Sequence, residues 1–148
     1  MAGERVILVG CVKLKQERPA RAKDLYRSPL WLRRRRYAEA SGSPWLILSA
    51  KHGLIDPERR IAPYDLALGQ LSAGERRAWG ERVVRQLEDR FGSIGGTTFE
   101  VHAGALYRRA IEPGIVERGG KVMAPLAHLG QGKQLAWYTK NAARSSRR

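Results

Sequence analysis

Reactive side chains follow a short apolar run in the first half of the chain. Residues 45–48 read Trp-Leu-Ile-Leu and predict a buried strand, and Ser49, Lys51 and His52 come directly after it, around the turn at Gly53. A hydroxyl, an ammonium and an imidazole so close together can exchange protons or bind an anion. Because ligands of open α/β sheets sit beyond the carboxyl ends of the strands, this pattern predicts a site. The alternative is an ordinary strand exit whose lysine and histidine are solvated.

Carboxylates that could assist bond cleavage stand in two places farther along the chain. Tyr64 and Asp65 follow a proline, which constrains the backbone that carries the phenol and the carboxylate. Glu100 and His102 alternate with an apolar residue at the end of a β-branched run, so both face one side of the expected strand. Asp65 is the first candidate for a catalytic carboxylate, and Glu100 is the second. The alternative for Asp65 is an ion pair with one of the many arginines.

The end of the first apolar run carries a thiol and two amines. Cys11 lies at the end of residues 5–12, with Lys13 and Lys15 beside it. The thiol is a nucleophile only where a base or a positive field favours the thiolate, and a small buried thiol is commoner. A single cysteine excludes a disulfide framework and a Cys-rich metal site. The chain also lacks GxGxxG after its first strand, a Walker A sequence and HExxH, so we expect neither a cofactor nor a metal.

Length and composition predict one globular domain. The 148 residues can bury a core, and 43% of them are hydrophobic. No apolar run approaches the ~20 residues that span a bilayer, so we expect no membrane partner. The first residues lead directly into a strand-like run, unlike a signal peptide. We therefore expect a cytoplasmic protein.

Positive charge is the strongest global signal. The chain has 28 Lys+Arg against 14 Asp+Glu, a net charge of +14, and its basic residues concentrate at 13–23, at 33–36 and in the C-terminal tail. Such a surface attracts polyanions, so we expect a nucleic-acid partner, with DNA favoured over RNA. The four arginines at 33–36 point in several directions around a helix, and Arg34 and Arg35 are the candidates for phosphate binding. The alternative is a solvated basic surface, or arginine usage inherited from a GC-rich genome.

The elements that must position these residues alternate between strands and helices. Strands are expected at 5–12, 45–48, 97–101 and 121–124. Helices are expected from Ser28 to Ser41, from the Ser72 capping box to about Phe91, after Gly104 until Pro113-Gly114, and from about Gln131. This alternation predicts a single α/β domain over residues 1–141, a three-layer α/β/α arrangement with a mostly parallel central sheet. Residues 142–148 are expected to form a flexible basic tail.

Several motifs resemble one protein family. They are Cys11-x-Lys13-x-Lys15, Ala22-x-Asp24-Leu25-Tyr26-x-Ser28, Ser49-Ala50-Lys51-His52-Gly53-Leu54 and Pro63-Tyr64-Asp65. The chain resembles the YaaA-like superfamily over most of residues 5–138. The resemblance is to a bacterial and phage family of largely unknown function, distantly similar to the peroxide-stress protein YaaA and to a domain of archaeosine-synthase-type relatives of tRNA-guanine transglycosylase. The first motif of that family usually reads Cys-Ser-x-x-Lys, and here Val12 stands in the place of the serine. The resemblance implies nucleic-acid binding, a stress or DNA-damage context and a link to modified-base chemistry.

Three functions are consistent with these observations. The first is a DNA glycosylase-like enzyme that cleaves the N-glycosidic bond of a modified or damaged base. In this hypothesis Asp65, Lys51 and His52 are catalytic; Cys11, Ser49, Tyr64, Glu100 and His102 bind the base and sugar; and Lys13, Lys15, Arg34 and Arg35 hold the backbone. Lys51 could instead attack the sugar carbon as an amine, followed by lyase activity. The second function is non-catalytic DNA binding that protects damaged DNA, and the third is an enzyme on a free nucleotide, with the anion held at the Gly104 helix start.

Overall fold

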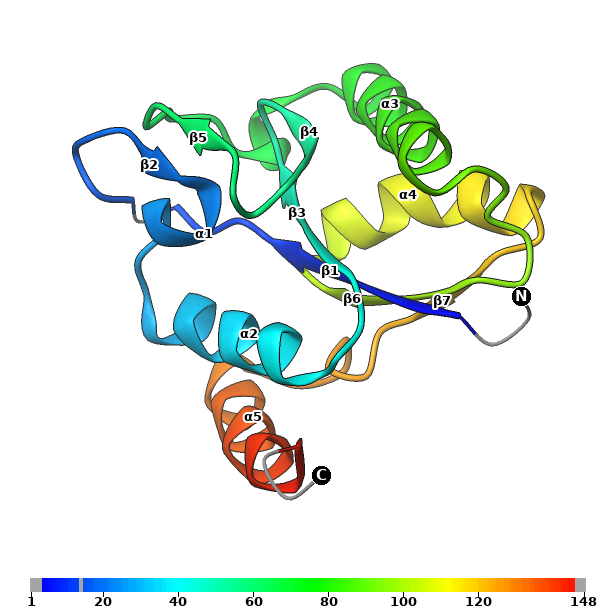
Figure 1. The fold of residues 1–148 in the computed structure, drawn as a ribbon. Helices are drawn as coiled ribbons and strands as arrows, with labels where there is room; N and C mark the ends of the chain where they lie inside the picture. Colours follow the sequence, from blue (N-terminus) through cyan, green and yellow to red (C-terminus); the bar gives the residue numbers. More distant parts are fainter. Residues whose placement is uncertain (1–3, 14, 146–148) are drawn as a thin grey trace.

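A five-stranded sheet forms the centre of the protein (Figure 1). The computed structural model describes residues 4–13 and 15–145. The strands lie in the order β4 (Gly53–Ile55), β3 (Trp45–Ser49), β1 (Arg5–Gly10), β6 (Thr98–His102) and β7 (Lys121–Met123). β1 pairs in parallel with β3 and β6, β7 extends the parallel set beside β6, and β4 runs antiparallel to β3. The expectation of a mostly parallel sheet is confirmed.

Helices cover both faces of this sheet, as the three-layer expectation requires. α3 (Ala73–Phe91) and α4 (Ala105–Glu117) lie on one face, and α2 (Pro29–Ala40) and α5 (Gln131–Ser145) lie on the other (Figure 1). Alternate side chains of β1 enter the two cores, because successive residues of a strand point to opposite faces. Leu8 packs towards α3 and α4, whereas Ile7 and Val9 pack towards α2 and α5.

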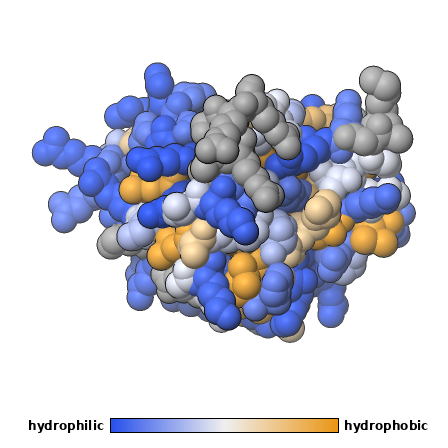
Figure 2. All heavy atoms as spheres, turned by 90° about the horizontal axis from the view of Figure 1, so that it is seen from below, coloured by the Kyte–Doolittle hydropathy of each residue, from blue (hydrophilic) through white to orange (hydrophobic). Residues whose placement is uncertain are grey.

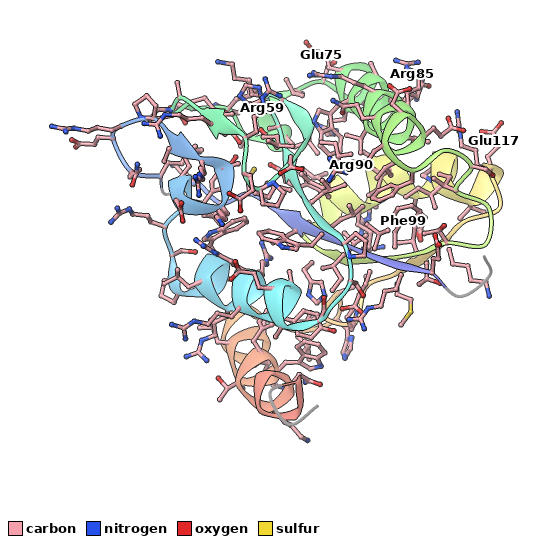
Figure 3. All side chains as sticks on the ribbon, in the orientation of Figure 1. Arg59, Glu75, Arg85, Arg90, Phe99 and Glu117 are labelled. Atoms are coloured by element: carbon pink, nitrogen blue, oxygen red, sulfur yellow. The ribbon has the colours of Figure 1, made fainter. Side chains whose placement is uncertain are left out.

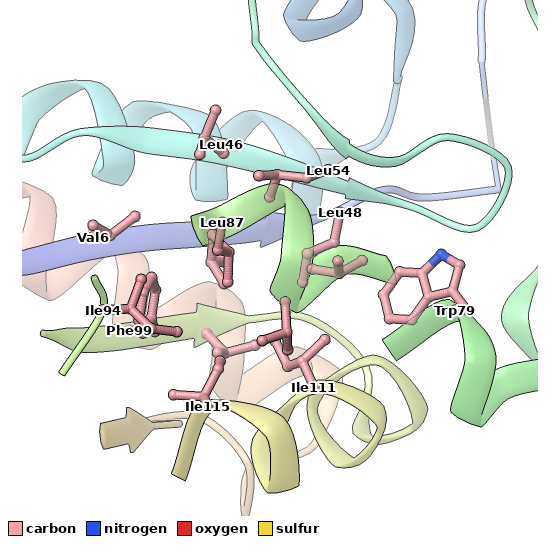
Figure 4. Close-up of a cluster of buried hydrophobic side chains, with 14 of the residues drawn as sticks. Val6, Leu46, Leu48, Leu54, Trp79, Leu87, Ile94, Phe99, Ile111 and Ile115 are labelled. Atoms are coloured by element: carbon pink, nitrogen blue, oxygen red, sulfur yellow. The ribbon is translucent and has the colours of Figure 1, made fainter. Parts of the chain in front are cut away.

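The core beneath α3 and α4 is built from the apolar stripe that the sequence predicts on α3. Trp79, Val83 and Leu87 are buried there against strand residues such as Leu48 and Phe99 (Figure 4). Each large apolar side chain buried in this way contributes about 1.5–3 kcal/mol to folding. The caps at the helix starts are also as expected. Ser28 Oγ accepts a hydrogen bond from the N–H of Trp31, and Ser72 forms a capping box with Glu75.

Small elements extend the fold beyond the carboxyl ends of β1 and β3. β2 (Ala20–Arg21) pairs antiparallel with β5 (Arg60–Ile61), α1 (Ala22–Leu25) follows β2, and a 3₁₀ turn, η1 (Leu68–Gln70), precedes α3 (Figure 1). Two-residue strands have too little periodicity to be recognised in a sequence. They matter because they hold the segments that carry Lys15 and Asp65.

One expected helix boundary is wrong. Pro113 and Gly114 lie inside α4, which continues to Glu117. Close packing against α3 outweighs their helix-breaking preference. A Cβ atom at Gly114 would lie 2.9 Å from Val84 Cγ2, and one at Gly80 would lie 1.9 Å from the carbonyl oxygen of Ala110. The two helices therefore need glycine where they cross.

The last helix extends into the segment that the sequence predicts as a tail. α5 runs to Ser145, and residues 146–148 lie outside the described residues. Hydrophilic side chains dominate the face seen from the α5 side, around smaller hydrophobic patches (Figure 2). In the part of the chain that the structure describes, none of the helices is both long and apolar enough to cross a membrane.

Candidate functional site

The carboxyl ends of β3, β1 and β6 meet at one edge of the sheet. The chain leaves β1 towards α2 on one face, whereas it leaves β6 towards α4 on the other. Such a divergence opens the crevice in which ligands of α/β sheets bind. At its floor the two strand ends touch, because a Cβ atom at Gly10 would lie 2.5 Å from the Cβ of Ala103.

A chain of buried hydroxyl groups anchors the segment that carries Asp65. Ser49 Oγ accepts a hydrogen bond from the N–H of His52 at 3.2 Å and donates to the hydroxyl of Tyr64 at 2.7 Å. The Tyr64 hydroxyl in turn lies 2.6 Å from that of Tyr26. Burial raises the pKa of both phenols, so both keep their protons. Tyr64 is thereby fixed to the end of β3, with Asp65 next to it in the chain.

Lys15 covers the ring of Tyr64. Its Nζ lies 4.5 Å from the centre of the Tyr64 ring and 5.8 Å from that of Tyr26, and it donates to the carbonyl oxygen of Lys13 at 3.0 Å. Burial lowers the pKa of the Lys15 ammonium, and the charges of Cys11 and Asp65 only partly offset this. Lys15 is therefore a better proton donor, and more often a neutral amine, than a solvated lysine.

His52, in the turn after β3, also contacts Tyr64. The His52 ring packs edge-on against the Tyr64 ring, with 5.6 Å between ring centres. Burial lowers the pKa of His52, and the nearby charges of Arg59 and Lys51 add to this effect. The imidazole is therefore neutral near pH 7 and can accept a proton.

A pocket of about 330 Å³ opens between these groups and α4. It is lined by Cys11, Val12, Lys13, Lys15, Asp65, Leu66, Ala67, Gln70 and Tyr107. Cys11 Sγ lies 3.4 Å from the Tyr107 hydroxyl across it. Lys13, Lys15 and Asp65 also line an adjoining hollow of about 590 Å³ beside Tyr64. A thiol, two amines, a carboxylate and two phenols thus border two adjoining hollows at the carboxyl end of β1.

Asp65 has no ion-pair partner within the described residues. The side chain is exposed and faces the pocket that Lys13 and Lys15 line. In so basic a chain an exposed carboxylate normally finds an arginine, which was the alternative explanation for this residue. The geometry therefore leaves Asp65 available to a ligand.

Glu100 and His102 belong to a second cluster, on the α2 and α5 face of β6. His102 Nε2 lies 2.6 Å from Glu100 Oε2, and its Nδ1 lies 2.6 Å from the Tyr138 hydroxyl. Arg5 also pairs with Glu100, at 3.2 Å, and donates to the hydroxyl of Tyr37 at 2.8 Å. Burial raises the pKa of Glu100, but hydrogen bonds from His102 and Tyr37 outweigh it and lower the pKa overall. Burial lowers the pKa of His102, so a neutral imidazole donates to a carboxylate and accepts from Tyr138.

The two arginines expected to bind phosphate lie in different environments. Arg34 is only 7% exposed, and its Nη1 donates to the carbonyl oxygen of Gly10 at 3.3 Å. Arg35 is paired with Asp24 at 2.7 Å and with Glu39 at 3.4 Å. Neither arginine is presented on the surface as an unpaired cation.

Lys51 does not line the pockets that Asp65, Lys13 and Lys15 line. It is exposed in the turn between β3 and β4, where its carbonyl oxygen accepts a hydrogen bond from Arg82. The turn is tight: Gly53 has φ +73, and a Cβ atom there would lie 2.4 Å from Gln86 Oε1. Lys13 and Lys15 line the pockets that Asp65 lines, and Lys51 lines neither of them.

Three residues of the site are not among those that the sequence predicts: Gln70 and Tyr107, which line the pocket, and Tyr26, whose hydroxyl lies beside that of Tyr64. Tyr26 lies within a motif that supported the family resemblance, which was the one available signal. Tyr107 lies in the first turn of α4, where the sequence indicates anion binding by backbone N–H groups and gives no role to the phenol. The described residues contain no group of three or more His, Cys, Asp or Glu side chains arranged to hold a metal ion.

A match to one protein family spans this whole arrangement. A family of unknown function, DUF6884, matches residues 6–140. The chain belongs to this family. The DUF6884 range includes every strand end described above, together with Cys11, Asp65 and Tyr107. The uncharacterized protein YfjM of Bacillus subtilis (strain 168) is similar, with 32% identity over 99 residues. That match covers 58% of this chain and 66% of YfjM, so the chain spans just under two thirds of its relative.

Proposed function

We propose that the protein binds nucleic acid, DNA in preference to RNA, and cleaves the N-glycosidic bond of a modified or damaged base. One observation carries the proposal: Asp65, a carboxylate with no ion-pair partner among the described residues, shares a pocket with Lys13 and Lys15 at the carboxyl end of β1. A net charge of +14 supplies the long-range attraction for a polyanion.

The pocket has the size and chemistry for an extruded base. Its volume of about 330 Å³ lies at the lower end of the range for small-molecule sites. A flipped base can stack on Tyr107, which lines this pocket, and meet hydrogen-bonding groups at its edge. Lys13 is exposed at the pocket mouth, where it can pair with a backbone phosphate.

The bond-breaking step needs a base for water and an acid for the leaving group. Asp65 accepts a proton from a water molecule, whose oxygen bonds to C1′ of the sugar as the bond between C1′ and the base nitrogen breaks. The Lys15 ammonium then donates a proton to the departing base. The carboxylate also stabilises the positive charge that develops on the sugar. We assign the acid to Lys15 and not to Lys51, because Lys15 lies in the same pocket as Asp65.

The YaaA-like resemblance is part of this proposal. Cys11, Lys13, Lys15, Tyr64 and Asp65 all belong to the motifs that carry the resemblance, and each lines one or both of the two hollows. A link to modified-base chemistry is thus consistent with the residues that line the site.

Non-catalytic nucleic-acid binding is the second candidate, and a different surface favours it. A groove of about 710 Å³ between α3 and α4 is lined by Arg76, Arg77, Arg85, Arg109 and Arg118. Arg85 projects outward from α3 (Figure 3). Such a groove can hold a phosphate backbone without any bond cleavage, and it shares no lining residue with the Asp65 pocket.

A panel of oligonucleotides distinguishes the two candidates. Duplex and single-stranded DNA and RNA containing uracil, oxidised, alkylated or hypermodified bases are incubated with the protein, and abasic sites are counted. Asp65→Asn should abolish base release and retain salt-dependent binding. Asp89→Asn, an exposed carboxylate on α3, is the matched control and should retain both. Binding without release on every member of the panel would favour the non-catalytic candidate.

A further inference from the structure

Two arginine side chains line a small pocket at the start of α4. Its volume is about 100 Å³, and it is lined by Arg34, Val101, His102, Ala103, Gly104, Ala105, Arg108, Ala124, Leu126, Ala127, Gln134 and Tyr138. Two arginines, an imidazole, an amide and a phenol provide its polar groups. None of these described lining residues is a carboxylate; Arg108 pairs with Glu112, which lies outside the lining, at 3.9 Å, and Arg34 has no such pair among the described residues.

Arg34 is the most unusual of these residues. It is 7% exposed, yet it pairs with no carboxylate in the part of the chain that the structure describes. Its Nε has no hydrogen-bond partner there, its Nη1 makes a long bond to the carbonyl oxygen of Gly10, and the Tyr138 hydroxyl lies close to the guanidinium. Burial lowers the pKa of the Arg34 guanidinium, because the cation has lost its water. A buried charge of this kind normally has a counter-charge, so the site calls for an anion.

The backbone supplies further donors at the same place. The first N–H groups of a helix have no acceptor within the helix, and the helix dipole favours an anion beside them. α4 begins after Gly104, which makes no side-chain cap to those groups. Arg108 lies one turn into the helix and lines the pocket opposite Arg34. Backbone N–H groups and two guanidinium groups together form a typical phosphate site.

We propose that this pocket binds a phosphoryl group, with Arg34 and Arg108 as its counter-charges and the start of α4 as its donor of N–H groups. The volume of about 100 Å³ is less than a third of that of the Asp65 pocket, which favours a small group such as a phosphoryl over a nucleobase. The identification of the ligand as part of a nucleic acid or nucleotide rests on the proposed function.

The position of the pocket fits a nucleotide. Tyr107 lines the Asp65 pocket, and the adjacent Arg108 lines the phosphoryl pocket. Across the sheet, Arg34 reaches the carbonyl oxygen of Gly10, next to Cys11. A nucleotide can therefore place its base by Cys11 and Tyr107 and a phosphoryl group by Arg34 and Arg108. This subsite would fix the sugar relative to Asp65.

Inorganic phosphate is the simplest probe. Its affinity is measured by calorimetry, and its effect on the thermal midpoint is compared with sodium chloride at equal ionic strength. Wild-type protein should bind phosphate and unfold at a higher temperature in its presence. Arg34→Met should bind it roughly tenfold more weakly or worse, since charge-assisted hydrogen bonds are lost. Arg36→Met removes an exposed arginine from the same helix and should leave the phosphate response unchanged.

The same variants separate a ligand-binding role from a structural one. Without phosphate, Arg34→Met should be at least as stable as wild type, because it removes an unpaired buried charge. Arg108→Gln provides a milder change, at a partly exposed residue, and should also lose the phosphate response. An equal response in wild type, Arg34→Met and Arg108→Gln, or no response in wild type, would overturn the proposal. So would a loss of stability in Arg34→Met that phosphate does not affect.

The source of the phosphoryl group is then assigned with nucleotides. A nucleoside 5′-monophosphate and oligonucleotides with or without a 5′-phosphate are titrated into wild type and Arg34→Met. Tighter binding of the 5′-phosphorylated forms by wild type alone assigns a terminal phosphate. Equal Arg34 dependence for both oligonucleotides assigns an internal phosphate, and no Arg34 dependence for any of the three contradicts the inference. These titrations need no base release, so they stand even if the glycosylase proposal fails.

Discussion

Replacement of Tyr64 by phenylalanine removes one hydroxyl from the centre of the site and leaves the ring in place. That hydroxyl accepts from Ser49 Oγ at 2.7 Å and lies 2.6 Å from the Tyr26 hydroxyl. Ser49 and Tyr26 are 0% and 2% exposed, so water cannot replace the lost partner. Each hydrogen bond contributes about 1 kcal/mol net, so Tyr64→Phe should lower the free energy of unfolding by about 2 kcal/mol.

Urea unfolding of wild type and variant measures this loss. The expected change corresponds to a fall in the thermal midpoint of about 4–8 °C for a chain of this size. Burial raises the pKa of Tyr64, so the phenol stays protonated and the loss should be the same at pH 7 and pH 9. Ser49→Ala and the double variant complete a cycle, whose coupling should be about 1 kcal/mol. A loss below about 0.5 kcal/mol, or strictly additive effects, would refute the hydroxyl chain.

Three further predictions concern stability. Burial lowers the pKa of His102 and of His52, so the unfolded chain binds protons before the folded chain as the pH falls below about 6.5. The free energy of unfolding should therefore decrease from pH 7 to pH 5. His102→Gln should make this decrease smaller, as measured by urea unfolding at each pH. Glu100→Gln leaves the buried His102 imidazole and Arg5 without their carboxylate, and should lower the free energy of unfolding by about 1–3 kcal/mol in urea. A change near zero would argue against the hydrogen-bond network around Glu100. Gly80→Ala forces a Cβ atom into the backbone of α4 and should lower the free energy of unfolding by about 1–3 kcal/mol. Gly74→Ala, in the first turn of the same helix, should be neutral or stabilising. Equal thermal midpoints for the two variants would contradict the close crossing of α3 and α4.

Local patterns in the sequence were sufficient to predict the main elements of the fold. Ser28 and Ser72 stand where helix caps are needed, and the apolar runs around Val9 and Leu48 are long enough to identify the central strands. The predicted end of α4 at Pro113 is wrong, because the contacts that keep the chain helical beyond Pro113 are made with α3. Packing of α4 against α3 cannot be inferred from residues of α4 alone.

The site was harder to predict because neighbours in sequence are not always neighbours in space. Ser49, His52 and Tyr64 were expected together and do contact one another. Lys51 lies between two of them in the chain, yet it is exposed in the turn after β3. Lys15, which was assigned to the backbone of the nucleic acid, folds over Tyr64 instead. No sequence pattern distinguishes these two lysines.

The environment of Arg34 is another feature that the sequence does not predict. In the sequence it is one of four successive arginines, and such a run suggests a solvated basic surface. In the fold its position on the inner side of α2 carries it under the end of β1. Its burial and the lack of a carboxylate partner in the described chain become visible only in three dimensions.

The comparison of Lys15→Met with Lys51→Met tests the central claim most directly. Both variants remove one ammonium, but only Lys15 lies in the pocket with Asp65. On an oligonucleotide from which wild type releases a base, single-turnover release should fall at least about 100-fold in Lys15→Met, as expected for loss of a general acid, and stay within about twofold in Lys51→Met. Equal rates in the two variants, or the absence of base release by wild type on every oligonucleotide of the panel, would contradict the account.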